Sequence, residues 1–82
     1  MIRTVSNKNG TEFSYLDWNG QNMKEIREFI GKEIPIELLN YRTLLINNEH
    51  LADIGDCFVT DKFGYSFRIY SPEEFRKKFK YV

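Results

Sequence analysis

The sequence predicts an α+β domain in which a small, mainly antiparallel sheet of four or five strands packs against two short helices. Apolar residues at helical spacing indicate the first helix, at about 22–31, and a strong helix-start signature indicates the second, at about 72–79. Short apolar or alternating segments between Asn-Gly, Asn-Asn and Gly-Asp turn signals indicate the strands. With 82 residues, the chain 1–82 is long enough for one domain.

The composition is that of a small folded domain. A chain of this length buries only about 60–65 % of its unfolded surface, so its core needs large side chains, and 16 % of the residues are aromatic. The formal net charge is zero, which argues against a protein that coats nucleic acid, because such a protein needs excess positive charge. Cys57 is the only cysteine and no apolar stretch approaches a membrane span, so we expect a cytoplasmic protein that does not enter a membrane.

The first half of the chain contains two strand segments and the clearest helix. Residues 2–5 and 13–18 flank a polar turn that ends in Asn-Gly. Asn22 and Glu25 have the spacing of a capping box, and Gly31 is placed to end the helix in a left-handed conformation. Pro35 argues against continuation of the helix, and the two leucines at 38 and 39 are expected to fill a gap in the core.

The second half is expected to supply the rest of the sheet and the second helix. Residues 41–46 form a buried strand, and the segments 57–60 and 65–70 flank a four-residue hairpin loop. Ser71, Pro72 and Glu74 occupy the positions of a strong helix start. One core is expected from these elements, made of Met23, Ile26, Phe29, Ile30, Leu45, Val59, Phe67, Ile69, Phe75 and Phe79.

The residues that could carry catalysis or bind a metal are few. His50, Asp53, Asp56 and Cys57 lie within eight positions, but one His and one Cys cannot complete a tetrahedral zinc site. Cys57 with His50 is the only nucleophile–base pair, and no fixed spacing supports it. The five glycines are scattered beside turns and helix ends, so they form no phosphate-binding loop. We therefore expect no catalytic residues, no metal, no cofactor and no enzyme activity.

Two surfaces are candidates for binding. The basic tract contains Arg76, Lys77, Lys78 and Lys80, which either contact nucleic acid or complement the dipole of the helix end over a buried Phe79. The chain also has more aromatic residues than a small core can hold, and the stretch 49–61 carries four acids and no Lys or Arg. The candidate protein-binding residues are Trp18, Phe63, Tyr65, Tyr70, Asp53 and Asp56.

The order of these segments resembles a widespread group of small bacteriophage and prophage proteins. The shared features are an aromatic strand that ends at Trp18, a polar turn into a helix, Gly55-Asp56 before a hydrophobic strand, a glycine-containing hairpin, and a segment led by Pro72. The resemblance covers most of positions 12–82 and implies a phage context, but it assigns no binding or catalytic residues.

Three functions are carried as hypotheses. The first is a non-catalytic phage accessory protein that binds a host protein, for example as an inhibitor of a bacterial defence system such as CRISPR–Cas. The alternative is a nucleic-acid-binding accessory protein that uses the basic tract of the C-terminal helix. The third is an enzyme with Cys57/His50 chemistry. The sequence leaves the partner, the host pathway and the oligomeric state open.

Overall fold

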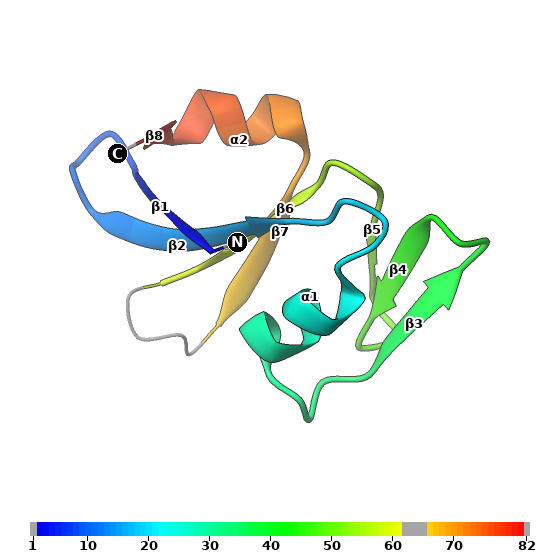
Figure 1. The fold of residues 1–82 in the computed structure, drawn as a ribbon. Helices are drawn as coiled ribbons and strands as arrows, with labels where there is room; N and C mark the ends of the chain where they lie inside the picture. The colour runs from blue at the N-terminus through cyan, green and yellow to red at the C-terminus, as the bar shows by residue number, and fades with distance from the viewer. Residues whose placement is uncertain (1, 62–65, 82) are drawn as a thin grey trace.

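The computed structural model describes residues 2–61 and 66–81, so the predicted binding residues Phe63 and Tyr65 lie outside the described part of the chain. Two helices and eight strands occur in the described residues (Figure 1). Their order is β1 (Arg3–Ser6), β2 (Glu12–Asp17), α1 (Met23–Ile30), β3 (Ile36–Leu39), β4 (Thr43–Ile46), β5 (His50–Ala52), β6 (Cys57–Thr60), β7 (Phe67–Tyr70), α2 (Pro72–Lys78) and β8 (Lys80–Tyr81).

The strands form two antiparallel sheets, which confirms the α+β class. The larger sheet has the order β7-β6-β2-β1-β8, and the smaller one has the order β3-β4-β5. The sequence predicted a single sheet and missed β3, since Pro35 and the mixed pattern around it favoured an irregular segment. Leu38, which was expected to fill the core, is instead 39 % exposed on this outer strand. No helix among the described residues is long and apolar enough to cross a membrane.

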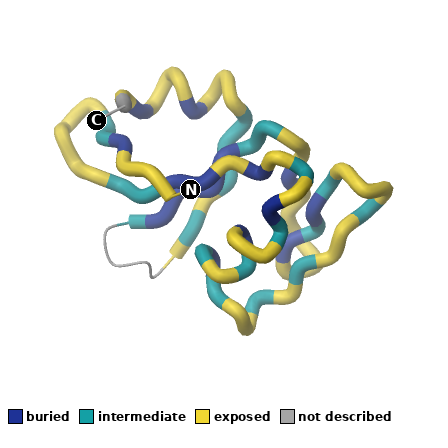
Figure 2. Tube along the Cα trace, in the orientation of Figure 1, coloured by how far each residue is buried: buried dark blue, intermediate teal, exposed yellow. Residues whose placement is uncertain are grey.

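Both faces of the larger sheet are covered, so the structure has two hydrophobic clusters where the sequence predicted one core. Neighbouring residues of a strand point to opposite faces. Leu16 and Phe58 therefore pack with Ile26 of α1 and with the smaller sheet, whereas Tyr15 and Val59 pack with α2. Figure 1 shows α2 on one side of the sheet and α1 on the other, and Figure 2 shows the buried residues gathered along the strands between them.

The start of α1 differs from the capping box that the sequence predicted. The Asn22 side chain accepts no hydrogen bond from the helix; its Oδ1 accepts from the Asn19 N–H at 2.9 Å, and its Nδ2 donates to the Asp17 carbonyl at 2.8 Å. Asn22 is only 8 % exposed, and it thus holds together the turn between β2 and α1. Gly31 follows the helix with φ 115° and ψ 131°, a positive-φ conformation outside the left-handed helical region.

The start of α2 confirms the predicted capping box. The Ser71 hydroxyl accepts from the Glu74 N–H at 3.2 Å, and the Glu74 carboxylate accepts from the Ser71 N–H at 3.3 Å. Pro72 occupies the first turn. Beyond the last helical residue the Phe79 N–H donates to the Phe75 carbonyl, and both rings are buried against the sheet.

Candidate functional site

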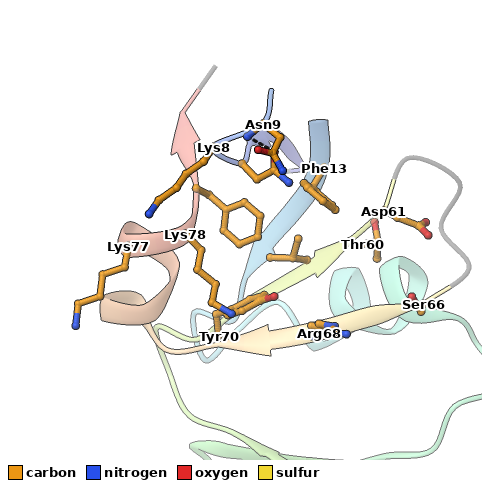
Figure 3. A pocket seen from close by; sticks show the side chains of 13 residues that line it. Lys8, Asn9, Phe13, Thr60, Asp61, Ser66, Arg68, Tyr70, Lys77 and Lys78 are labelled. Atoms are coloured by element: carbon orange, nitrogen blue, oxygen red, sulfur yellow. Dashed lines mark hydrogen bonds between the residues drawn. The ribbon is translucent and has the colours of Figure 1, made fainter. Parts of the chain in front are cut away.

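A cavity of about 570 Å³ opens where α2 meets the turn between β1 and β2 and the adjacent strands β6 and β7. Figure 3 shows the side chains of these separate segments arranged around it. The lining residues are Asn7, Lys8, Asn9, Phe13, Val59, Thr60, Asp61, Ser66, Arg68, Tyr70, Lys77, Lys78 and Phe79, and we call this site the basic pocket.

The turn between β1 and β2 places Lys8 at one side of the basic pocket. Asn7 Oδ1 accepts from the N–H groups of Asn9 and Thr11 at 3.0 and 2.9 Å, which fixes the turn. Strand β1 also pairs with β8, with Ser6 opposite Lys80. This pairing brings the turn beside the end of α2, and Figure 3 shows Lys8 extending toward that helix.

Aromatic rings form the apolar wall of the basic pocket. The ring of Phe79 meets those of Phe13 and Tyr70 edge to face, each at a centroid distance of 5.4 Å. The Lys78 ammonium lies 5.2 Å from the centroid of the Tyr70 ring, within the range of a cation–π interaction. The rings are thus held in place by packing, and one of them already carries a cation on its face.

The charge of the basic pocket is predominantly positive. Among the described lining residues, four are cationic, Lys8, Arg68, Lys77 and Lys78, and one, Asp61, is acidic. Lys77 Nζ lies 3.5 Å from a carboxylate oxygen of Glu73, but both side chains are 75 % exposed, so water screens this pair. Within residues 2–61 and 66–81, no carboxylate forms an ion pair with Lys8, Arg68 or Lys78. The site therefore favours an anionic ligand.

Several of the predicted binding residues are not brought together. Trp18 is 1 % exposed and its indole N–H donates to the Arg42 carbonyl at 2.8 Å, so the prediction that this ring reaches a partner is wrong. Tyr70 lines the basic pocket. Asp53 and Asp56 share a separate turn, in which the Asp53 N–H donates to Asp56 Oδ2 at 2.9 Å.

The predicted basic tract divides into two pairs. Lys77 and Lys78 line the basic pocket, whereas Arg76 and Lys80 are exposed and do not line it. Lys8 and Arg68 were missed, because only the pairing of β1 with β8 and of β6 with β7 brings them to the end of α2. In the sequence, Lys8 lies in a polar, Asn-rich turn. This is the usual position of a solvated lysine, so it gave no indication of a binding role.

Cys57 and His50 do not form a common site. Cys57 is 5 % exposed in the cluster under α2, and its Sγ donates to Asp17 Oδ1 at 3.2 Å. Burial and this hydrogen bond raise the pKa of Cys57 to about 12. His50 lies on β5 of the other sheet, with its exposed ring 3.7 Å from Glu49. No group of three His, Cys, Asp or Glu suited to a metal ion occurs in the described ranges 2–61 and 66–81.

We expect Cys57 to react slowly with iodoacetamide in the folded protein. The thiolate is the nucleophile, and both the raised pKa and the burial of the sulfur reduce its availability. Alkylation at pH 8, followed by mass spectrometry, should be at least about 100-fold slower in buffer than in denaturing urea. Similar rates with and without urea, under conditions where circular dichroism shows the fold intact, would contradict the buried position of this thiol.

Comparison with known proteins yields no relative: no protein-family model, no curated protein and no solved structure matches this chain. The resemblance to the group of phage proteins therefore stays a prediction from the sequence.

Proposed function

We propose that this protein is a non-catalytic binding protein and that its basic pocket takes a single-stranded nucleic acid. The observation that carries the proposal is a single cavity lined by four cationic residues from three separate segments together with aromatic rings. Lys8 comes from the turn after β1, Arg68 from β7, and Lys77 and Lys78 from α2. Proteins that bind single strands combine a cationic groove for the phosphates with aromatic side chains for the bases.

The shape of the basic pocket favours a single strand over a duplex. The four cationic residues line a cavity of about 570 Å³ together with the aromatic rings of Phe13, Tyr70 and Phe79. A single strand can turn its bases toward that wall while its phosphates meet the lysines, whereas the bases of a duplex are already stacked. The zero net charge of the chain is consistent with this local mode, because only one part of the surface needs to be positive.

The proposal predicts salt-dependent binding of single strands. Fluorescence anisotropy with labelled fifteen-nucleotide strands, dT and rU, measures the affinity between 50 and 200 mM NaCl. If all four cations contact phosphates, the affinity should fall about 50-fold over this range, since each contact contributes about −0.7 to the logarithmic salt slope. The same bases on an uncharged peptide-nucleic-acid backbone serve as the control and should bind weakly. Absence of binding at low salt, or binding that salt does not weaken, would contradict the proposal.

Protein binding is the second candidate function. The observation that favours it is the outer edge of β7 in the described part of the chain, which lies along a second, acidic groove. The narrower hypothesis of a phage-encoded protein that inhibits a host defence system stays a prediction, supported by the resemblance in the sequence.

A further inference from the structure

A second and larger cavity, of about 1020 Å³, follows the whole length of β7. Its other side is formed by the end of α1 with the segment after it, and by the turn between β4 and β5 with the start of β5. Thr60, Ser66, Arg68 and Tyr70 line both this cavity and the basic pocket, so β7 separates the two sites. We call this second cavity the edge groove.

The edge groove exposes the unpaired side of a β-strand. Among the described residues, β7 is the outermost strand of the larger sheet and pairs with β6 alone. In an antiparallel pair, every second residue of such a strand turns its N–H and C=O groups away from its neighbour. An extended peptide can occupy this position as an added strand, and main-chain hydrogen bonds then supply much of its affinity.

Apolar side chains in the edge groove can receive alternate side chains of an added strand. Phe67 and Ile69 of β7 are half-buried there, and Ile30 and Ile34 lie across the groove from them. Leu51 on β5 is 60 % exposed, although it lines the same cavity. A strand in this position would therefore cover apolar surface as well as a free strand edge.

The charge of the edge groove is opposite to that of the basic pocket. Among the described residues that line the edge groove are four carboxylates, Glu33, Glu49, Asp56 and Glu74, and one permanent cation, Arg68. Desolvation by burial raises the pKa of Asp56, and the nearby carboxylates of Asp53 and Glu74 raise it further. Lysine or arginine side chains of a ligand would relieve this repulsion.

We propose that the edge groove binds an extended basic segment of a partner protein, which adds to β7 as a further strand. This inference deepens the second candidate function, protein binding, and it is argued from acidic and apolar residues that do not line the basic pocket. A second copy of this chain is a poorer occupant, because a symmetric pairing of two β7 edges would place two acidic grooves against each other.

The test uses the full chain and a fluorescent eight-residue peptide of alternating valine and lysine. We expect binding by anisotropy, with amide shifts in nuclear magnetic resonance spectra at β7 and along the groove. The same peptide with glutamate in place of lysine should bind at least about tenfold more weakly. Two further peptides carry backbone N-methyl groups, one on all the valines and the other on all the lysines. In an added strand, only every second residue donates its N–H to β7, so only one of these two peptides should lose binding.

Charge-reversed variants test the location. The double variant Glu33→Lys/Glu49→Lys should lower the affinity for the valine–lysine peptide at least about tenfold. The matched control Glu12→Lys/Glu28→Lys changes exposed acids that do not line the groove and should leave the affinity within about twofold, although the net charge changes equally. The proposal would be overturned if the valine–lysine peptide did not bind at millimolar concentration, if the glutamate peptide bound equally well, or if both methylated peptides still bound. It would also be overturned if both double variants lost the same affinity, or if sedimentation showed a dimer paired through β7.

This outcome is separable from that of the basic pocket. The substitutions at Glu33 and Glu49 should not lower the affinity for single-stranded nucleic acid. If the protein binds nucleic acid in a salt-dependent way but binds no peptide, only the edge-groove proposal is overturned. Capture of a protein partner by a surface other than β7, mapped by nuclear magnetic resonance, would preserve protein binding as a function but likewise overturn the proposed site.

Discussion

Replacing Trp18 by alanine is expected to lower the free energy of unfolding by about 3–5 kcal/mol. The ring is 1 % exposed and belongs to the cluster that joins the larger sheet, α1 and the smaller sheet. The substitution removes a large buried volume and also the hydrogen bond from the indole N–H to the Arg42 carbonyl. Because a domain of this size is stabilised by only about 4–12 kcal/mol, much of the variant should be unfolded at 37 °C.

Urea denaturation followed by circular dichroism measures this effect, since the variant lacks the only tryptophan of the chain. Trp18→Phe keeps an aromatic ring but loses the hydrogen bond, so we expect an intermediate loss of about 1–3 kcal/mol that stays measurable if the alanine variant does not fold. Tyr41→Ala is the exposed-aromatic control: Tyr41 is 87 % exposed, and the change should stay within about 0.5 kcal/mol. A loss below about 1 kcal/mol for Trp18→Ala would show that this ring is not part of the core.

Reversing two charges of the basic pocket, with Lys77→Glu/Lys78→Glu, is expected to lower the affinity for single-stranded nucleic acid about 100-fold at 50 mM salt. Under the proposal, each substitution removes a phosphate contact and adds a repulsive charge at the basic pocket. The logarithmic salt slope should become shallower by about 1.4 if two contacts are lost. The anisotropy titration described above measures both quantities.

The matched control for this prediction is Arg76→Glu/Lys80→Glu. It changes the net charge equally and lies in the same basic tract, but neither residue lines the basic pocket. We expect a reduction of no more than about fivefold, from long-range electrostatics alone. An equal loss in the two double variants would indicate a diffuse basic tail and would reject the pocket as the binding site. The neutral variant Lys77→Gln/Lys78→Gln, checked by circular dichroism, separates lost contacts from the weakening of α2 by acids at its C-terminal end.

The features that the sequence predicted correctly depend on neighbouring residues. The start of α2 follows from Ser71, Pro72 and Glu74, which satisfy the first backbone groups of the helix within one turn. The pairing of β6 with β7 and the apolar stripe of α1 were also predicted from short stretches of sequence, although the predicted hairpin loop lies largely outside the described residues. Lys77 and Lys78 belonged to the predicted nucleic-acid surface because they are adjacent in the chain.

The features that the sequence missed depend on residues far apart in the chain. Asn22 has the pattern of a helix cap, but the backbone of Asp17 and Asn19 occupies its amide. Trp18 was expected at a surface because the chain has more aromatic residues than one small core can hold. The larger sheet buries both of its faces, and this second cluster accommodates the surplus.

The sequence by itself determined the α+β class, both helices and most of the strands, because helix caps, turns and apolar periodicity act over a few residues. Only the tertiary structure decided that the strands form two sheets and that Lys8, Arg68, Lys77 and Lys78 line one cavity with Phe13, Tyr70 and Phe79. It also decided that β7 remains a free edge beside four carboxylates. The reason is that strand order and register are set by the burial of whole faces, which no local pattern specifies.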